Sequence, residues 1–324
     1  MIAEKMLQEL RNRFGGIIQE NVLLSNFTTM NVGGPADALI VAHSANQLAD
    51  TIQTMWKLRI PFVVLGSGSN LLVSDKGIRG VAIINHAHNI KIDTHHDPIT
   101  VWAESGALMV NIGKKLILRG LSGMEWAATI PGTVGGAVYG NAGAFGKETC
   151  RNLVSADVLH KIHGRDIWDC DRFEYSYRSS NIKRNSEKAI VLSATFSVEQ
   201  GDMDEVKEKM SSYKKRRAKI QPPGPSVGSV FRNPINDKAG RLIEAVGLKG
   251  RKIGGGIISP KHANFIINLG GAKAQDIFDL IIIAQDQVLK EFGVSLVPEI
   301  ELIGEWEHVP DFLESNIHRY LEDE

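Results

Sequence analysis

The feature that most constrains this chain is a glycine-rich stretch at residues 123–146, GMEWAATIPGTVGGAVYGNAGAFG, which carries almost no charge. Apolar residues such as Trp126, Val134 and Val138 are interleaved with the glycines and are expected to be buried, so the stretch is not a flexible linker. Glycine permits a positive φ and a close approach of the backbone to another group. Bare main-chain N–H groups could then bind a flat or anionic ligand. A tightly packed crossing of strands explains this stretch equally well on its own.

Size and charge narrow the class of protein. A chain of 324 residues is long enough for two or three domains with the core of an enzyme. Lys plus Arg and Asp plus Glu are balanced at 37 each, so no overall charge favours nucleic acid or a membrane surface. The amino terminus is typical of an amphipathic helix rather than a signal peptide, and no apolar run approaches the length of a membrane span. We therefore expect a cytoplasmic protein, with Cys150 and Cys170 as free thiols.

A second glycine motif follows a predicted β-α-β unit, formed by a strand at 38–41, a helix that begins after Ser44 and a strand at 61–65. The motif is GSGSN at 66–70, and another strand follows it. A Rossmann fold would instead place a helix there. The loop is therefore predicted to be a nest of N–H donors that binds an anion, assisted by the hydroxyls of Ser67 and Ser69. An ordinary β-turn is the alternative, and for this motif alone it is favoured.

The rest of the chain predicts a mixed α+β fold with many short strands. Further strands are expected at 81–84, 91–93, 100–103, 152–159 and 189–197, and helices at 108–118 and 202–217. The sequence QPPGP at 221–225 is a rigid connector into a last domain. That domain is predicted to contain helices near 239–246 and 274–292 and strands at 264–268 and 299–303.

Three segments together resemble the UDP-N-acetylenolpyruvoylglucosamine reductase (MurB) family. They are VLGSGSNLLVSDKGIRG (64–80), IPGTVGGAVYGNAGAFG (130–146) and PSVGSVFRNP (225–234), and KHANFIIN (261–268) and VPEIELIG (297–304) agree in the same order. The resemblance covers residues 26–304, and motifs this long rarely coincide by chance. Little room is left between Arg178 and the strand at 189 for the substrate-gating insertion, with its tyrosine, of one branch of the family. The chain therefore resembles the shorter branch.

The resemblance implies a fold and a reaction. The fold is α+β, with an FAD-binding region of the p-cresol methylhydroxylase/vanillyl-alcohol oxidase type in two subdomains (1–85 and 86–200), a separate substrate-binding domain (201–304) and a tail (305–324). The reaction is reduction of UDP-N-acetylenolpyruvoylglucosamine to UDP-N-acetylmuramate for peptidoglycan precursor synthesis, with noncovalent FAD and with NADPH as hydride donor. A monomer that binds this small molecule, and neither nucleic acid nor membrane, is expected.

The same resemblance implies the FAD contacts. Fixed main-chain dipoles can hold the FAD pyrophosphate without a Lys or Arg. The expected contacts lie in the two glycine-rich segments and are Gly66, Ser67, Gly68, Ser69, Asn70, Ile130, Pro131, Gly132, Thr133, Gly135, Gly136, Asn141, Ala142 and Gly143. None of the ten histidines has a convincing metal-ligand spacing, so no essential metal is expected.

Three residues are the catalytic candidates. Hydride transfer from flavin N5 to the enolpyruvyl methylene leaves an enolate, which needs charge stabilisation and a proton donor. By resemblance Ser229 donates the proton, while Arg178 stabilises the charge through its guanidinium and Glu299 polarises the substrate or relays a proton. Residue type alone allows plainer roles: a surface arginine, a serine that bonds its own turn and a solvated acid at a strand end.

The substrate contacts expected are Tyr177, Lys219 and Asn233, the last two at the UDP end. The neighbouring run at 214–217 could meet the pyrophosphate, although cations near a helix C-terminus also complement the helix dipole. Two other functions remain open: a flavin-dependent alcohol or phenol oxidase of the same fold, and a flavin or nucleotide-sugar binding protein without turnover. A proton donor has no use in a passive binder, which argues against the second.

Overall fold

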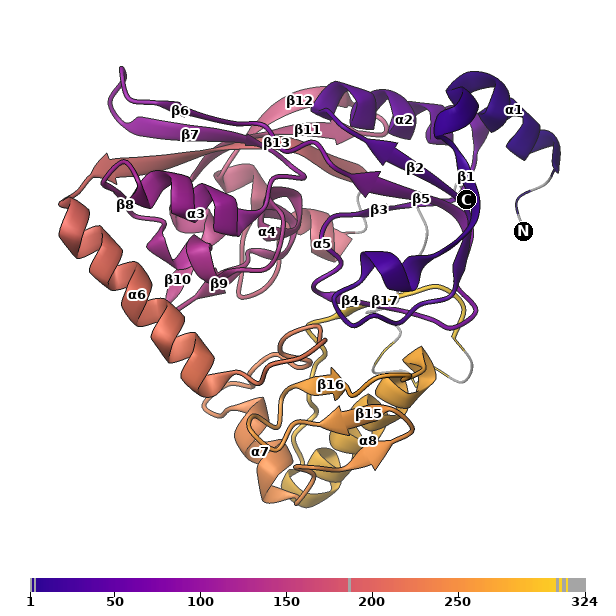
Figure 1. Cartoon of the computed structure of the whole chain (residues 1–324), viewed down its shortest axis with the longest axis vertical. Helices are drawn as coiled ribbons and strands as arrows, with labels where there is room; N and C mark the ends of the chain where they lie inside the picture. Colours follow the sequence, from indigo (N-terminus) through magenta and orange to yellow (C-terminus); the bar gives the residue numbers. More distant parts are fainter. Residues whose placement is uncertain (1, 3, 186–187, 307–308, 311–312, 314–324) are drawn as a thin grey trace.

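The computed structural model describes residues 2, 4–185, 188–306, 309–310 and 313, and every structural statement below concerns these residues. Figure 1 shows two sheets in the upper part of the molecule and a smaller α+β unit below them. The long helix α6 (Met203–Ile220) runs down one side and connects the upper part to the lower unit. No described helix is long and apolar enough to cross a membrane.

The first sheet has the order β1-β2-β5-β3, in which β2, β5 and β3 run parallel and β1 is antiparallel to β2. Its parallel strands are almost entirely apolar, as expected for a sheet covered on both faces. One face packs on α1 and α2. Ser44 begins α2, as predicted, by accepting a hydrogen bond from the Gln47 N–H at 3.1 Å. The bounds are α1 Glu4–Phe14, β1 Gln19–Leu23, β2 Pro35–Ala42, α2 Ala45–Leu58, β3 Phe62–Leu65 and β5 Ile78–Asn85.

The second sheet is antiparallel, with the order β12-β11-β13-β7-β6, and β8 also pairs with β13. Helices α3 and α4 cover it, and Trp126 and Trp168 are buried in the core that they share with the strands. The bounds are β6 Ile90–Asp93, β7 Ile99–Glu104, α3 Met109–Ile117, β8 Leu121–Ser122, α4 Val134–Gly140, β9 Gly143–Ala144, β10 Lys147–Glu148, β11 Leu153–His160, β12 Gly164–Asp169, α5 Asn181–Asn185 and β13 Ala189–Gln200.

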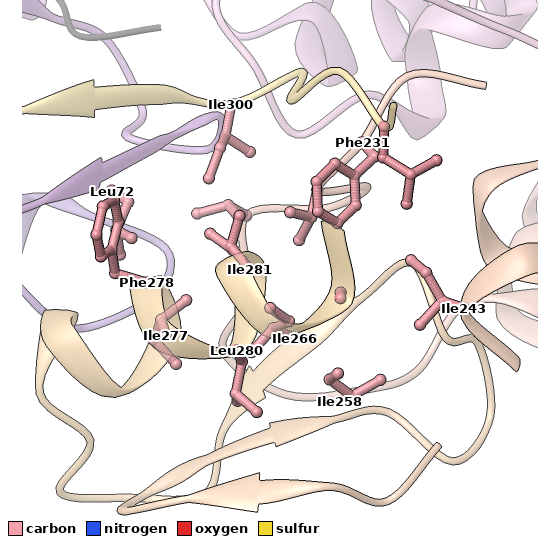
Figure 2. Packing of buried hydrophobic residues seen from close by; sticks show 14 of the residues in the cluster. Leu72, Phe231, Ile243, Ile258, Ile266, Ile277, Phe278, Leu280, Ile281 and Ile300 are labelled. Carbon is pink, nitrogen blue, oxygen red and sulfur yellow. The ribbon is translucent and has the colours of Figure 1, made fainter. Parts of the chain in front are cut away.

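The lower unit packs a three-stranded sheet, β14-β15-β16, against the helices α7 and α8. Figure 2 shows that its core is formed by α8 residues such as Ile277 and Ile281, together with Phe231 and Ile300. Leu72, which lies far earlier in the chain, belongs to the same core. The bounds are α7 Ala239–Ala245, β14 Lys252–Ile253, β15 Gly256–Ile258, β16 Ile266–Asn268 and α8 Ala274–Phe292.

The chain returns to its first part at β17 (Glu301–Ile303), which pairs in parallel with β4 (Leu71–Val73). Asp75 strengthens this junction, since its carboxylate accepts hydrogen bonds from the N–H groups of Ala274 and Gln275 at 2.8 and 3.0 Å, at the start of α8. The strand predicted at 299–303 therefore forms over residues 301–303 and joins the lower unit to the loop region around β4. The predicted domain boundaries remain a prediction, and much of the predicted tail at 305–324 lies outside the described residues.

One element corrects the sequence analysis. No helix was predicted within the glycine-rich stretch at 123–146, but residues 134–140 form α4. Thr133 begins this helix, with its hydroxyl accepting from the Gly136 N–H at 3.4 Å, and Val134, Ala137 and Val138 bury one face in the core. That burial offsets the poor helix propensity of glycine.

Candidate active site

The two glycine-rich segments meet in space. The Ser67 hydroxyl donates to the carbonyl of Pro131 at 2.9 Å. Gly66 lies so close to the second segment that a Cβ added there would be 2.5 Å from the Thr133 hydroxyl oxygen. Two segments that sequence analysis assigned to one cofactor are therefore in contact.

The GSGSN loop is fixed by the protein on one side and open on the other. Gly68 has a φ of +63°, and a Cβ at this position would lie 2.1 Å from the carbonyl oxygen of Phe27. The Gly68 carbonyl accepts from the N–H and the hydroxyl of Thr29 at 3.1 and 3.2 Å. Among the described residues, none accepts a hydrogen bond from the N–H groups of residues 67–70. The loop thus keeps several donors for an anion, as a nest does.

The second segment also presents bare backbone. A Cβ at Gly140 would meet no atom within 4 Å, and at Gly136 its nearest contact would be the Thr133 hydroxyl at 3.6 Å. Gly143 differs, because a Cβ there would be 2.2 Å from the Lys147 carbonyl oxygen. Both explanations of the glycines therefore apply at different positions: some leave open space, and others allow tight packing of the backbone.

Asn141, a predicted FAD contact, is bonded to other parts of the protein through its side chain. Its buried side chain donates to the Glu148 carboxylate and to the Ser176 carbonyl, each at 3.1 Å, and accepts from the Cys150 N–H at 3.1 Å. These protein groups occupy both ends of the amide, because Asn141 ends α4 in the left-handed conformation and its side chain turns inward. Its main-chain N–H donates to the Ala137 carbonyl and its own carbonyl accepts from Arg178, so Asn141 is bonded within the protein and its contact with FAD stays a prediction.

Arg178 and Glu299 form the charged centre of the site. The Arg178 Nε is 3.1 Å from a Glu299 carboxylate oxygen, although the two residues are 121 positions apart in the sequence. The guanidinium also donates to the carbonyls of Gly143 at 2.8 Å and Asn141 at 3.3 Å. Arg178 therefore connects the end of the glycine-rich segment to Glu299.

Burial raises the pKa of Glu299 above its ordinary value, against the opposing positive charges of Arg178, Lys183 and Arg232. Desolvation disfavours the charged carboxylate, so the carboxyl keeps its proton to a higher pH than an exposed glutamate would. This is the unusual pKa that a proton-donating or proton-relaying role requires.

Ser229 lies on a loop that is hydrogen-bonded to the backbone of Glu299, just before β17. The Glu299 N–H donates to the carbonyl of Val230 at 2.8 Å, and Gly228 turns the chain with a φ of +78°. The Ser229 hydroxyl has no hydrogen-bond partner among the described residues. Its loop is placed beside Glu299, and its proton is not committed to another protein group.

Asn264 lies within the motif KHANFIIN and was not predicted as a site residue. Its buried amide exchanges hydrogen bonds with Phe231, accepting from the N–H at 2.9 Å and donating to the carbonyl at 2.8 Å. Its own carbonyl accepts from the Val230 N–H at 2.9 Å. Asn264 therefore holds the Ser229 loop in place.

Comparison with known proteins agrees with this geometry. Residues 219–303 match the model described as UDP-N-acetylenolpyruvoylglucosamine reductase, C-terminal domain, and residues 36–164 match an FAD binding domain. The UDP-N-acetylenolpyruvoylglucosamine reductase of Bacillus subtilis (strain 168) is 40% identical over 302 residues, which is 93% of this chain and 99% of the relative. The chain belongs to the UDP-N-acetylenolpyruvoylglucosamine reductase family.

Other members of this reductase family also match along most of their length. The Clostridium botulinum (strain Eklund 17B / Type B) enzyme is 41% identical over 290 residues, covering 89% of this chain and 93% of the relative. The crystal structure of the Thermus caldophilus enzyme superposes with a TM-score of 0.74 at 33% identity, over 87% of this chain and 97% of that one. These matches confirm the expected family, its FAD-binding fold and cofactors, and its reductase activity.

The predicted substrate contacts of this family member are more scattered. Lys219 is exposed at the end of α6. The Asn233 side-chain oxygen accepts from the Ala239 N–H at 3.2 Å and so supports the start of α7. Tyr177 is 47% exposed, with the Arg178 guanidinium 5.0 Å from its ring centre. The structure brings only Tyr177 to the Arg178–Glu299 pair.

A basic cavity lies near the C-terminal end of α6, and of its lining only the run at 214–217 was considered in the sequence as a possible contact. Its volume is about 470 Å³, and it is lined by Thr129, Lys214, Arg217, Ala218, Gln221, Pro222, Pro223 and Lys261. Burial lowers the pKa of Arg217. The lining contains three cations and no carboxylate, and Thr129 directly precedes the segment 130–136. No group of three or more potential metal-ligating side chains occurs in the described part of the chain.

Proposed function

We propose that this chain catalyses the NADPH-dependent, FAD-mediated reduction of UDP-N-acetylenolpyruvoylglucosamine to UDP-N-acetylmuramate, with Arg178, Ser229 and Glu299 acting on the enolpyruvyl group. The observation that carries the proposal is the meeting of Arg178 and Glu299 at 3.1 Å, beside the Gly143 carbonyl and the Ser229 loop. A charge-stabilising cation, a carboxyl with a raised pKa and a free hydroxyl are the groups that protonation of an enolate requires.

The glycine-rich segments fit FAD. The free N–H groups of residues 67–70 would hold the pyrophosphate, and the open backbone at Gly136 and Gly140 would lie against the cofactor. When bound there, FAD supplies the hydride chemistry that no side chain of the protein can supply. The protein fixes where the cofactor lies and limits the access of water.

Arg178 is held in advance in the orientation that it needs. Its three contacts, to Asn141, Gly143 and Glu299, fix the plane of the guanidinium before substrate arrives. When Glu299 holds its proton, the positive charge of Arg178 is not neutralised and is available to the substrate carboxylate and to the charge that develops as the enolate forms. The raised pKa of Glu299 therefore serves Arg178 as well as proton transfer.

Ser229 delivers the proton to the carbon of the enolate. A hydroxyl is a weak acid, but the enolate is a strong base, so the transfer is not uphill. The Ser229 loop is bonded through Val230 to the backbone of Glu299, which keeps the two groups in a constant relation. Glu299 assists by polarising the substrate or by relaying a proton.

The basic cavity is the better candidate for the substrate diphosphate than Lys219 or Asn233. Lys214, Arg217 and Lys261 line it, and a half-buried guanidinium without a carboxylate in the lining favours an anionic ligand. Lys261 Nζ is also 2.7 Å from the carbonyl of Ala218, which offsets the negative end of the α6 dipole. Arg217→Met should therefore raise the KM for the sugar nucleotide more than Lys219→Met does.

The decisive experiment is spectroscopic. The purified protein should show bound flavin absorbance that NADPH bleaches, and the enolpyruvyl sugar nucleotide should restore it under anaerobic conditions. Rapid restoration by oxygen but not by the sugar nucleotide would identify an oxidase instead. If neither oxygen nor the sugar nucleotide reoxidises the reduced flavin, the protein binds flavin without turnover. A protein that takes up no FAD would refute the proposal.

A further inference from the structure

We propose that Lys183 and Glu301 form a second charge pair that positions Glu299 and sets the pH range over which Glu299 holds its proton. The inference rests on the proposed function for its kinetic consequence, but its structural basis is independent of turnover. Neither Lys183 nor Glu301 was predicted as a site residue from the sequence.

The pair is close and largely shielded from water. Lys183 Nζ lies 2.5 Å from a Glu301 carboxylate oxygen, and the two side chains are only 10% and 16% exposed. A buried ion pair adds little net stability, because desolvation of both charges offsets their attraction. Its presence in a shielded position therefore points to a role in placing a neighbouring group or tuning its charge.

The neighbouring group is Glu299, two residues before Glu301. Ile300 lies between them and points into the apolar core of the lower unit (Figure 2), which leaves the two carboxyl side chains outside that core. Asn70 holds both residues by their main chains, since its amide donates to the Glu299 carbonyl at 3.1 Å and its carbonyl accepts from the Glu301 N–H at 2.9 Å.

The opposing segment supplies the two cations. Arg178 lies just before α5 and pairs with Glu299, and Lys183 lies five residues later, within α5, and pairs with Glu301. Two cations of one segment therefore meet two carboxyl groups of another. We call this arrangement of Arg178, Lys183, Glu299 and Glu301 the double clasp.

The charges around Glu299 come from several elements. The positive charges of Arg178, Lys183 and Arg232 each oppose the effect of burial on its pKa. Glu301 faces Lys183, and Glu148 is 3.8 Å from Arg178. Tyr139 also contacts the pair, with its ring centre 5.7 Å from Lys183, and burial together with Glu301 raises its pKa, so its hydroxyl stays neutral. Arg178 pairs with Glu299 itself, whereas Lys183 pairs with Glu301, the second carboxylate of the same segment.

The two members of the pair therefore act on Glu299 with opposite signs. Removing the charge of Lys183 takes away a cation that favours the ionised carboxylate, so the pKa of Glu299 should rise. Removing the charge of Glu301 takes away an anion and leaves Lys183 uncompensated, so the pKa of Glu299 should fall. A purely mechanical clasp would respond to both changes in the same way, because either change breaks the same contact.

The kinetic test is the pH dependence of kcat/KM for the sugar nucleotide. Activity should fall as pH rises through the pKa of Glu299. We expect Lys183→Met to move the pH at which activity falls upward by about one unit, and Glu301→Gln to move it downward by about one unit, the lower end of the pKa shift that a neighbouring charge causes. Lys183→Arg keeps the positive charge, so the pH at which activity falls should not change. Shifts in the same direction, or no shift, would overturn the proposal.

A second measurement keeps the test independent of turnover and of a poorly folding variant. The pKa of Glu299 can be followed by carboxyl ¹³C NMR in the full-length protein, with Glu299→Gln to assign the signal. If Glu301→Gln does not fold, the double variant Lys183→Met/Glu301→Gln leaves no unpaired buried charge, and its pKa should lie below that of Lys183→Met. Matched changes in the more exposed Arg165–Asp157 pair, whose atoms are 2.6 Å apart, should move nothing. If the variants show the predicted NMR shifts but the protein has no reductase activity, the proposed function is refuted and this inference still holds.

Discussion

The two halves of the site differ in the kind of chemical group that they present to a ligand. The loop at 66–70 and the segment 130–136 contain no charged residue and present main-chain groups and small side chains. The double clasp consists of four charged side chains from two segments that lie more than 100 residues apart. One half offers fixed dipoles, and the other offers groups whose protonation can change.

The difference follows from what each half has to bind. The charge of a resident pyrophosphate is constant, so dipoles that are already oriented suffice and no reorganisation is needed. A substrate that gains and loses charge during reaction needs neighbours whose pKa values are tuned by burial and by other charges. Changes in the first half should therefore alter FAD retention, and changes in the second half should alter turnover.

The largest effect is expected in the second half, at Ser229. Ser229→Ala should lower kcat by about 10²–10⁴-fold, the usual contribution of a well-placed acid, while FAD content and reduction by NADPH stay unchanged. Stopped-flow reoxidation by the sugar nucleotide measures the affected step. Ser226→Ala, in the same loop, is the control and should turn over normally. Reoxidation of Ser229→Ala at the parental rate would exclude Ser229 as the donor.

Arg178→Lys is expected to have the next largest effect. A lysine keeps the charge but cannot make the three directed contacts to Asn141, Gly143 and Glu299, so kcat/KM should fall by about 10–100-fold. Arg172→Lys provides the control, because Arg172 pairs with an exposed carboxylate on Asp166. Equal activity for both lysine variants would show that only charge matters at position 178.

Gly136→Ala probes the first half. Its Cβ would meet only the Thr133 hydroxyl oxygen at 3.6 Å, so the FAD-free protein should melt at the same or a higher temperature, since alanine favours a helix by about 0.5–1 kcal/mol. The Kd for FAD should rise by about tenfold, measured by fluorescence titration. Gly68→Ala is the contrast, because its Cβ collides with the Phe27 carbonyl oxygen and should destabilise even the FAD-free protein. Unchanged FAD affinity in Gly136→Ala would place the cofactor elsewhere.

The smallest effect is expected outside both halves, at Asp75. Asp75→Ala removes two hydrogen bonds at the start of α8 and should lower the free energy of unfolding by about 1–2 kcal/mol, measured by urea denaturation. FAD affinity should not change. Asp286→Ala, an exposed position on the same helix, should have an effect within about 0.5 kcal/mol. Loss of FAD from Asp75→Ala would mean that the junction and the cofactor loop are one unit.

Local patterns predicted much of the fold. The helix at 274–292 forms with the predicted limits, and Ser44 begins α2 as expected. Helix α4 was missed because glycine has a low helix propensity, while burial of Val134 and Val138 decides the local structure. Strands β1, β14 and β15 were also missed, since β14 and β15 are only two and three residues long and have no recognisable period.

The site could be predicted from the sequence only in part, because its residues come together through tertiary contacts. Arg178, Ser229 and Glu299 came from a family resemblance, and their spacing in the sequence gives no sign that two of them touch. Lys183 and Glu301 were missed because each looks like a surface charge until the fold brings the two segments together. Asn264 was missed likewise, since its side chain acts on the main chain of a residue 33 positions away. Contacts of this kind depend on tertiary structure and leave no local pattern.

The parallel pairing of β17 with β4 has a consequence for the order in which the enzyme is assembled on the ribosome. Both glycine-rich segments and both upper sheets are complete by residue 200, where β13 ends, so the FAD-binding part can fold while the remainder is still being made. The acid–base set is completed only when Glu299 emerges and the last strand adds to β4. A chain that stops before residue 299 would leave β4 as an open strand edge, ready to pair with other chains, and would lack Glu299.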